Sequence, residues 1–324
     1  MTSIWAVAEV AGGRPTRLSL EVATLVRALA EAAGADALAL AIGAGAAGAA
    51  MELAAYVPRV LAVEADTEAE RPDAAVVARR LLALVTERRP DVLLLPASPD
   101  GRDLAGLLAG ALDLPVLVSA GGVRWSDGGP VVQMSTFGGR LLTESAFSAG
   151  RGIVLVRPGT VDAAAAATAG TTELGAPALG PELPAVRVVG RVAQAGAAAS
   201  IDDARVVVAG GRGVGGPAGF GVIAELADAF GGAVGGTRAV VDAGWLPYSQ
   251  QIGQTGKIVK PALYVAAGIS GAIQHKVGMQ TSGTIVAINR DADAPIADFA
   301  DLVVVGDLFE IVPRLAAAVR ARRG

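Results

Sequence analysis

Residues 252–279 read IGQTGKIVKPALYVAAGISGAIQHKVGM. A turn rich in hydrogen-bond donors, 252–256, precedes an apolar run, 262–267, that is short enough for a strand buried on both faces. A glycine-containing turn then leads into a short helix, and Ser270 is suited to cap its first turn. Strand, glycine turn and helix in this order are typical of a parallel sheet covered by helices, so the stretch predicts an α/β fold.

The same stretch concentrates polar side chains that are rare elsewhere in the chain. The three lysines of the sequence, Lys257, Lys260 and Lys276, and its only histidine, His275, all lie here, whereas every other basic residue is an arginine. Arginine replaces lysine almost freely on a protein surface, so this concentration suggests side chains chosen for their chemistry. A surface helix of locally unbiased composition is the simpler alternative.

The alternation of strand and helix patterns extends outward over both halves of the chain. In the C-terminal half we expect strands at 206–209, 262–267, 284–288 and 302–305, and helices at 220–230 and 307–322. In the N-terminal half we expect strands at 4–10, 37–42, 60–64 and 92–96, and helices at 18–33, 73–88 and 102–111. Each half therefore predicts a mostly parallel sheet with helices on its faces, and the C-terminal sheet is expected to be doubly wound.

Two changes of pattern mark the organisation between these halves. From about residue 115 only strand patterns follow, which we interpret as an antiparallel extension of the first sheet: 116–118, 131–136, 140–147 and 152–156. The next segment, 158–200, is rich in Ala, Gly, Pro and Thr, with one strand-like run at 186–192, and is typical of a linker. We therefore predict an N-terminal α/β domain at 1–198 and a C-terminal doubly wound domain at 199–324.

Composition excludes several classes of function. A formal net charge of -4 and the lack of a basic block argue against a nucleic-acid surface. Without cysteine the chain has no disulfide, thiolate nucleophile or Cys-ligated metal, and one histidine makes a His-rich metal site implausible, so a redox role needs a bound cofactor. The apolar run 37–51 is too short to span a bilayer and the N-terminus has no signal-peptide pattern, so we expect a cytoplasmic protein.

A first glycine turn has the spacing of a dinucleotide-binding motif. Gly43, Gly45 and Gly48 follow a predicted strand, and Glu64 lies at roughly the distance of a ribose-binding acid. This arrangement would suit an NAD-dependent dehydrogenase, which is our alternative function. With 43 glycines in 324 residues, however, about one such match is expected by chance.

A second glycine turn suits a phosphate or a flavin edge better than a nicotinamide cofactor. Gly211, Gly213 and Gly216 lie between a predicted strand and a predicted helix, but no acid ends the next strand. Glycines allow a ligand to approach the backbone closely, and free N–H groups at a helix start attract anions. Arg212 would add a positive charge there, although an exposed arginine in a tight turn is an equally good interpretation.

The polar groups of the quoted stretch fit an isoalloxazine ring. Reduced flavin gathers negative charge near N1 and O2, where a helix start or the His275 imidazole would stabilise it. The Thr255 hydroxyl could bind N5, and Arg238 could lie near the ring. A solvated threonine, an ordinary capped helix and a surface histidine are the alternatives for each group taken alone.

The run GQTGKIVKPALYVAAGISGAIQHKVGMQTSGTIVAINRDADAPIADFADLVVVGDLFEIVP resembles the FAD-binding domain of the alpha subunit of electron transfer flavoprotein. The upstream segments VVVAGGRG and TRAVVDAGWLP are similar to the same family, so the resemblance covers the whole second domain. The first domain resembles the family more loosely, through its order of strands and the segment TFGGRLLTESAF.

The resemblance implies an electron carrier with no substrate turnover of its own. It implies a heterodimer with a beta subunit that the first domain contacts, and one FAD in the second domain. Electrons would come from acyl-CoA dehydrogenases of fatty acid β-oxidation or from other flavoprotein dehydrogenases, and would pass to a quinone oxidoreductase or another acceptor. A cofactor-free scaffold subunit is a further alternative.

The resemblance also implies which residues contact FAD. These are Arg212 near the glycine turn, Thr237 and Arg238 beside the ring, and Thr255 at N5; the others expected around the cofactor are Gln251, Ile252, Gly253, Gln254, Ser270, Gly271, Ala272, Ile273, Gln274, His275, Asn289, Asp307 and Leu308. Two positions depart from the family pattern. Thr237 replaces a serine and keeps the hydroxyl, and Lys260 stands where a small residue is usual.

Overall fold

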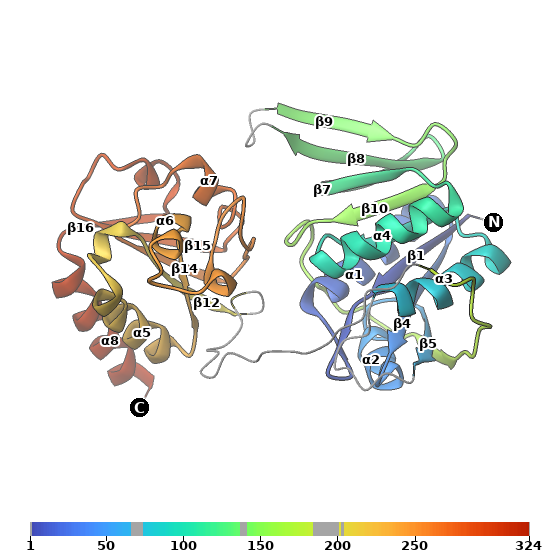
Figure 1. The fold of residues 1–324 in the computed structure, drawn as a ribbon, viewed down its shortest axis with the longest axis horizontal. Helices are drawn as coiled ribbons and strands as arrows, with labels where there is room; N and C mark the ends of the chain where they lie inside the picture. The colour runs from blue at the N-terminus through green and yellow to red at the C-terminus, as the bar shows by residue number, and fades with distance from the viewer. Residues whose placement is uncertain (1, 66–73, 137–140, 184–200, 202–203, 324) are drawn as a thin grey trace. The chain divides into compact units, whose positions relative to one another are not determined.

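The computed structural model of the chain describes residues 2–65, 74–136, 141–183, 201 and 204–323. The backbone forms two compact units, Met1–Gly190 and Arg191–Gly324 (Figure 1). The predicted domain boundary between 198 and 199 and the predicted strand at 186–192 both lie outside the described residues.

Within the described residues, the first unit is built on one nine-stranded sheet in the order β11-β5-β4-β1-β6-β10-β7-β8-β9. The sheet is parallel from β11 to β7 and antiparallel from β7 to β9. Its strands are β1 (Ser3–Ala8), β4 (Asp36–Gly43), β5 (Arg59–Glu64), β6 (Val92–Pro96), β7 (Val116–Ser126), β8 (Gly129–Thr136), β9 (Leu141–Ala146), β10 (Gly152–Val156) and β11 (Thr171–Leu174), beside a short hairpin of β2 (Val10–Ala11) and β3 (Arg14–Pro15).

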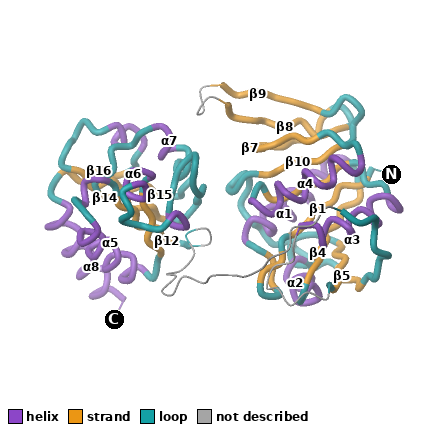
Figure 2. Tube along the Cα trace, in the orientation of Figure 1, coloured by secondary structure: helices purple, strands orange, loops and turns teal. Residues whose placement is uncertain are grey.

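Helices cover both faces of this sheet (Figure 2). They are α1 (Arg17–Ala33), α2 (Ala46–Leu53), α3 (Ala74–Arg88) and α4 (Pro99–Leu112). Alternate residues of one strand enter different cores, because successive strand side chains point to opposite faces. Ala6 of β1 packs with α1 and α2, whereas Trp5 packs with α3 and α4.

The helix ends follow from capping residues. Thr16 Oγ1 accepts a hydrogen bond from the Ser19 amide at 3.3 Å and begins α1, which ends at Gly34 with φ 60°. Ser98 Oγ accepts from the Gly101 amide at 2.9 Å and begins α4 at Pro99. The helix therefore starts three residues before the predicted position 102, because proline is favoured in the first helical turn.

Two sequence-based expectations for the first unit are wrong. β8 and β9 are antiparallel as predicted, but β10 lies between β6 and β7 and is parallel to both. All five residues of β10 are buried, as a strand covered on both faces requires. In the segment predicted to be a linker, Thr171–Leu174 forms β11, which pairs with the edge of β5 and keeps its side chains exposed.

The second unit has a five-stranded parallel sheet in the order β13-β12-β14-β15-β16 among the residues described there. Its elements are β12 (Val206–Gly210), α5 (Phe220–Phe230), β13 (Ala233–Gly236), α6 (Arg238–Asp242), β14 (Leu263–Ala267), α7 (Ile273–Lys276), β15 (Thr284–Asn289), β16 (Leu302–Val305) and α8 (Leu308–Arg323). One face packs against α5 and α8, and the other face packs around Tyr264. The α/β class predicted from the sequence is confirmed.

The order of the strands reverses between β12 and β14, and ligands of open parallel sheets bind at such a point, outside the carboxyl ends of the strands. Here the loops after β12 and β14 touch through glycine backbones. The Gly213 amide donates to the Gly268 carbonyl at 3.0 Å, and a Cβ on Gly213 would lie 2.6 Å from Gly268 Cα.

The described parts of the chain contain no helix with the length and hydropathy needed to cross a membrane.

Gly213→Ala is expected to destabilise the protein by about 1–3 kcal/mol, because the added methyl group overlaps backbone atoms that cannot rotate away. Gly221→Ala is the matched control: it lies on the exposed side of α5, where an added Cβ meets nothing within 4 Å. The control is expected to gain about 0.5–1 kcal/mol, because alanine favours a helix over glycine. Urea unfolding measures both, and equal effects would contradict the contact.

Candidate functional site

A cleft of about 620 Å³ lies at the carboxyl ends of the strands in the second unit. Its volume is in the range of small-molecule and cofactor sites. The lining comes from the turns after β12, β13, β14 and β15 and from the loop before β14: 211–213, 237–239, 242, 252–255, 268–270, 272, 274–275, 289, 291 and 294–295.

Most of the residues predicted from the sequence line this single cleft. They are Arg212, Thr237, Arg238, Ile252, Gly253, Gln254, Thr255, Ser270, Ala272, Gln274, His275 and Asn289. The fold thus brings together residues that are up to 77 positions apart in the sequence (Arg212 to Asn289).

Three predicted residues near the cleft are absent from its lining. Gln251 is buried and its Nε2 donates to Thr255 Oγ1 at 3.1 Å. Gly271 is packed so closely that a Cβ would lie 2.3 Å from the Ile296 amide nitrogen. Ile273 is exposed at the start of α7.

Asp307 and Leu308 also lie outside the lining. Asp307 forms a short ion pair with Arg290, and its other oxygen accepts from the Phe309 amide at 2.8 Å. The Arg290 and Phe309 hydrogen bonds lower the pKa of this carboxyl group. Leu308 is buried in the core under α8. Cofactor contacts by these two residues therefore stay predictions without support from the cleft geometry.

Two arginines line the cleft, and they differ in whether the guanidinium group forms an ion pair. Arg238, on α6, forms an i,i+4 ion pair with Asp242 at 3.1 Å, and both side chains are more than half exposed. Asp242 was not among the residues predicted from the sequence, although its spacing of four from Arg238 on a helix is typical of an ion pair. Arg212 is exposed and has no ion-pair partner among the residues that the structure describes. The cleft therefore offers an anion one uncompensated guanidinium and one shared guanidinium.

The Thr255 hydroxyl is oriented by its neighbours. Its oxygen accepts from Gln251, and the Thr255 carbonyl accepts from the Tyr248 hydroxyl at 2.6 Å. Because the oxygen already accepts a bond, the hydroxyl proton is left to donate into the cleft.

Ser270 does not cap a helix, so that prediction is wrong. α7 begins only at Ile273, and the residue before it, Ala272, has no side-chain cap. The reason is that Gly271 has φ 89°, a left-handed conformation that a helix cannot continue, and the Ser270 carbonyl accepts from the Ile296 amide at 3.0 Å. Ser270 still lines the cleft with an exposed side chain.

The His275 imidazole, expected to stabilise negative charge on a reduced flavin, carries no positive charge of its own at neutral pH. Burial lowers the pKa of this imidazole to about 4, against a smaller opposing effect of its hydrogen bond to Ile252. Nδ1 contacts the Ile252 carbonyl oxygen at 3.1 Å, and Nε2 contacts the Tyr264 hydroxyl at 2.9 Å. The ring is therefore neutral at pH 7, with both nitrogens bonded inside the protein.

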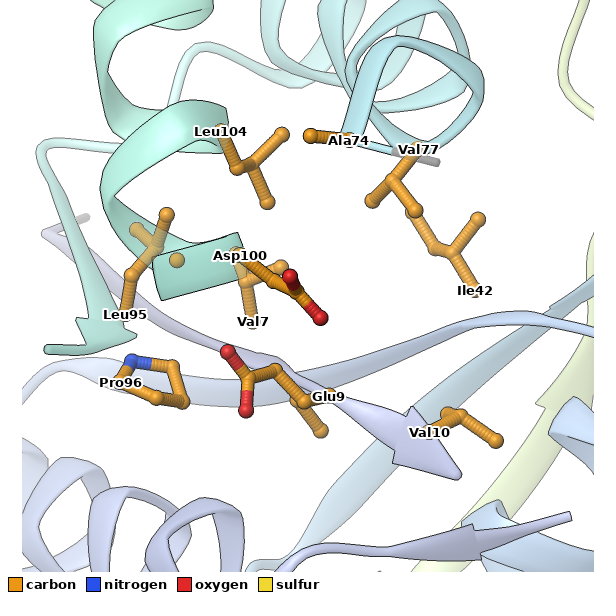
Figure 3. A pocket seen from close by; sticks show the side chains of 12 residues that line it. Val7, Glu9, Val10, Ile42, Ala74, Val77, Leu95, Pro96, Asp100 and Leu104 are labelled. Atoms are coloured by element: carbon orange, nitrogen blue, oxygen red, sulfur yellow. The ribbon is translucent and has the colours of Figure 1, made fainter. Parts of the chain in front are cut away.

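A small cavity of about 40 Å³ lies among the described residues of the first unit at the ends of β1 and β6, and it is too small for a nucleotide. The carboxylates of Glu9 and Asp100 face each other across it (Figure 3). Ser98 hydrogen-bonds to Glu9 and caps α4. These contacts indicate a structural role for the cavity.

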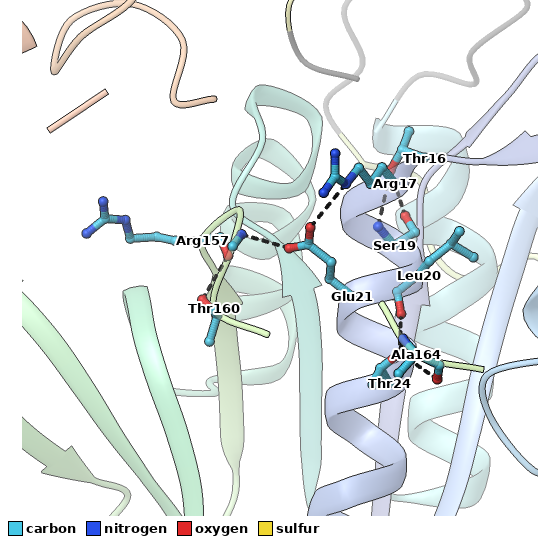
Figure 4. Close-up of polar contacts among 10 residues, drawn as sticks. Thr16, Arg17, Ser19, Leu20, Glu21, Thr24, Arg157, Thr160 and Ala164 are labelled. Carbon is cyan, nitrogen blue, oxygen red and sulfur yellow. Dashed lines mark hydrogen bonds and ion pairs between the residues drawn. The ribbon is translucent and has the colours of Figure 1, made fainter. Parts of the chain in front are cut away.

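The buried Glu21 of α1 also has structural partners (Figure 4). It accepts a hydrogen bond from the Gly159 amide at 2.7 Å and forms an ion pair with Arg17 at 3.6 Å. Thr24 binds the same loop at Ala164. The Arg157 side chain extends away from Glu21, and burial lowers its pKa. This cluster therefore fastens the loop after β10 to α1.

The glycine turn of the first unit is filled by the chain itself. The Glu64 carboxylate accepts hydrogen bonds from the amides of Gly45 at 3.0 Å and Ala47 at 2.8 Å. A Cβ on Gly45 would lie 2.7 Å from Gly13 Cα, so this glycine is explained by close packing. The amides that would bind a pyrophosphate in a dinucleotide fold are thus already used.

The chain is similar to known proteins over both units. The electron transfer flavoprotein domain family matches residues 4–179, and the electron transfer flavoprotein FAD-binding domain family matches residues 200–280. The electron transfer flavoprotein subunit alpha of Thermoanaerobacterium thermosaccharolyticum is 35% identical over 98% of this chain and 97% of its own length. This chain belongs to the electron transfer flavoprotein alpha family.

Other members of the electron transfer flavoprotein alpha family agree with this assignment. The protein of the same name from Mycobacterium leprae is 44% identical over 75% of this chain and 76% of its own length. The one from Megasphaera elsdenii is 34% identical over 99% and 97%. The cofactor expected from the sequence, FAD, is confirmed by the FAD-binding domain match, and membership of this family implies a role in electron transfer.

The residues of the cleft fit a flavin nucleotide. The exposed Arg212 guanidinium suits a pyrophosphate, whereas the Gly211 and Gly213 amides beside it already donate to the carbonyls of Ala267 and Gly268. Thr255, Gln254 and Gln274 offer neutral donors and acceptors of the kind that a flavin ring and ribityl chain require. The described residues contain no cluster of acidic or histidine side chains that could hold a metal ion instead.

The stability of this flavoprotein subunit is expected to fall as the pH drops from 6.5 to 4. The pKa of His275 is depressed in the folded state, so between these values the unfolded chain binds more protons. The expected loss is on the order of 3 kcal/mol. In His275→Asn this contribution disappears, while the carboxyl groups still titrate. Urea unfolding of the wild type and of the variant at each pH therefore isolates the contribution of His275 as the difference between their free energies of unfolding. Parallel pH profiles would contradict a buried neutral histidine.

Proposed function

We propose that the chain is the alpha subunit of a heterodimeric electron carrier and holds FAD in the cleft of the second unit. It accepts electrons from acyl-CoA dehydrogenases of fatty acid β-oxidation, or from other flavoprotein dehydrogenases, and delivers them to a quinone oxidoreductase or another acceptor. The observation that carries this proposal is the gathering of polar donors, two arginines and glycine turns in one cleft within the segment that matches the FAD-binding domain. The carrier turns over no substrate of its own.

FAD, when bound, supplies the electron-accepting chemistry, and the chain supplies binding and electrostatics. Arg212 would hold the pyrophosphate, and the Thr255 hydroxyl, oriented by Gln251, would donate a hydrogen bond to the ring at N5. Arg238 and Thr237 line the same cleft and would lie beside the ring, where the guanidinium would favour added negative charge. His275 contributes a neutral imidazole, so Arg238 is the positive charge that raises the reduction potential.

The partner of this chain is a beta subunit, which contacts the first unit, and the carrier acts in the cytoplasm. Support for the partner comes from the relatives, which are named as alpha subunits.

The alternative function, an NAD-dependent dehydrogenase built on Gly43, Gly45 and Gly48, is disfavoured by Glu64. A carboxylate already accepts from the turn amides, and a bound pyrophosphate would be repelled by it.

Co-expression of the chain with its beta subunit tests the carrier directly. We expect a yellow complex with one FAD per heterodimer, measured by its visible spectrum and by flavin quantification. A colourless complex that binds NAD would instead support the dehydrogenase. A colourless complex without either cofactor would support a scaffold subunit.

Arg238→Ala is expected to lower the midpoint potential of the bound flavin by roughly 60 mV, which is a tenfold change in a one-electron equilibrium. The positive charge is lost where negative charge accumulates, although the ion pair with Asp242 moderates its effect. Arg314→Ala, which removes an exposed arginine from α8 outside the cleft lining, is the control and leaves the potential unchanged. An unchanged potential in Arg238→Ala would refute the role assigned to this residue.

A further inference from the structure

A buried chain of hydrogen bonds joins three elements below the cleft. The Tyr264 hydroxyl on β14 contacts His275 Nε2 on α7 at 2.9 Å, and His275 Nδ1 contacts the Ile252 carbonyl oxygen at 3.1 Å. Tyr264 is fully buried and His275 is 6% exposed. The two rings are tilted by 54° with centroids 6.1 Å apart, so the contact between them is made through the hydroxyl.

The direction of these bonds follows from their chemistry. A carbonyl oxygen only accepts, so Nδ1 of His275 carries the proton and donates it to Ile252. A neutral imidazole with a protonated Nδ1 has a lone pair on Nε2, which accepts from the Tyr264 hydroxyl. Burial lowers the pKa of His275 and raises the pKa of Tyr264, so both side chains stay neutral. Each hydrogen bond therefore has a fixed donor: Tyr264 donates to His275, and His275 donates to the Ile252 carbonyl.

The hydrogen bond from His275 ends on Ile252, which belongs to the loop 252–255 that lines the cleft. The Gln254 amide donates to the Gln274 carbonyl at 2.7 Å, and a Cβ on Gly278 would lie 2.3 Å from the Gly253 amide nitrogen. Residues 252–254 therefore lie directly against α7 and the turn after it. Gln254 and Thr255, which line the cleft, belong to this same loop.

Helix α7 cannot fix this arrangement by itself. It has four residues and no side-chain cap, and so short a helix has little stability from its own hydrogen bonds. His275 is its buried residue, and the ring is anchored to the sheet by Tyr264. The position of α7 relative to β14 thus depends on this anchor.

We propose that Tyr264 is a positioning residue for the cofactor site: its hydroxyl holds the His275 imidazole inward, and the imidazole holds the Ile252 carbonyl and with it the cleft loop 252–255. Tyr264 does not line the cleft, so it acts on the cofactor only through His275 and this loop. The inference rests on the proposed function in one respect, namely that FAD is the occupant of the cleft.

The first test reads the imidazole directly. His275 is the only histidine, so the full chain labelled with ¹⁵N-histidine, made without a polyhistidine tag and combined with unlabelled beta subunit, gives the signals of one ring. We expect a neutral ring protonated at Nδ1 throughout pH 5–7. A charged ring at pH 7, or a proton on Nε2, overturns the inference without any variant.

The second test compares variants by amide hydrogen exchange in the FAD-loaded complex. Tyr264→Phe leaves Nε2 without its donor, and His275→Gln removes the donor to Ile252; both are expected to speed exchange of the Gln254 amide about tenfold and to weaken FAD binding about tenfold. His275→Asn places a donor near Nδ1 and is expected to stay within about threefold of wild type. Tyr56→Phe, which removes a tyrosine hydroxyl in the first unit, is the control and leaves this exchange unchanged.

The outcomes separate this inference from the proposed function. If the complex holds no FAD but Tyr264→Phe still speeds exchange at 252–257, the proposed function fails and the control of the loop by Tyr264 stands. If FAD binds in full and Tyr264→Phe changes neither exchange nor FAD affinity, the inference fails alone. Faster exchange spread evenly over the second unit would also overturn it, because a general loss of stability is not positioning.

Discussion

The contact between the backbones of Gly213 and Gly268 holds together the ends of the two strands on which the cleft is built. Neither position has room for a Cβ, and an amide–carbonyl hydrogen bond of 3.0 Å joins them. The turn after β12 carries Arg212 away from this contact on one side, and the turn after β14 carries Ser270 and α7 on the other. The close approach of the two turns is possible because the two residues in contact, Gly213 and Gly268, have no side chains.

Much of this arrangement could be predicted from the sequence. Strands buried on both faces, such as 92–96 and 263–267, are continuous apolar runs, and the helix 220–230 was located with correct bounds because glycines flank it. The stretch 252–279 was singled out by its concentration of Lys and His and by its resemblance to one family; His275 lines the cleft, but none of the three lysines is among the lining residues. The resemblance assigned Arg212 and Asn289 to one cofactor, and the fold brings both to one cleft because parallel strands end at the same edge of the sheet.

The errors share a physical origin in contacts between distant residues. Ser270 has the side chain of a helix cap, but Ile296 packs against Gly271 and forces a turn there. His275 was expected to direct its imidazole at the flavin, and only the fold places the Tyr264 hydroxyl and the Ile252 carbonyl at its two nitrogens. The strand order β6-β10-β7 likewise depends on distant partners, because β10 pairs with two strands, β6 and β7, that precede it in the sequence. Local pattern carries no information on any of these partners.

Glu64 shows how a protein can supply its own anion. The turn at Gly45 presents backbone amides as a phosphate-binding loop does, but the negative charge that satisfies them belongs to the neighbouring strand β5. The geometry of this turn is therefore independent of the concentration of any metabolite. In the second unit the Gly211 and Gly213 amides donate instead to the uncharged carbonyls of Ala267 and Gly268, so the positive charge of the Arg212 side chain is not neutralised at its own turn as the amides of the first turn are by Glu64.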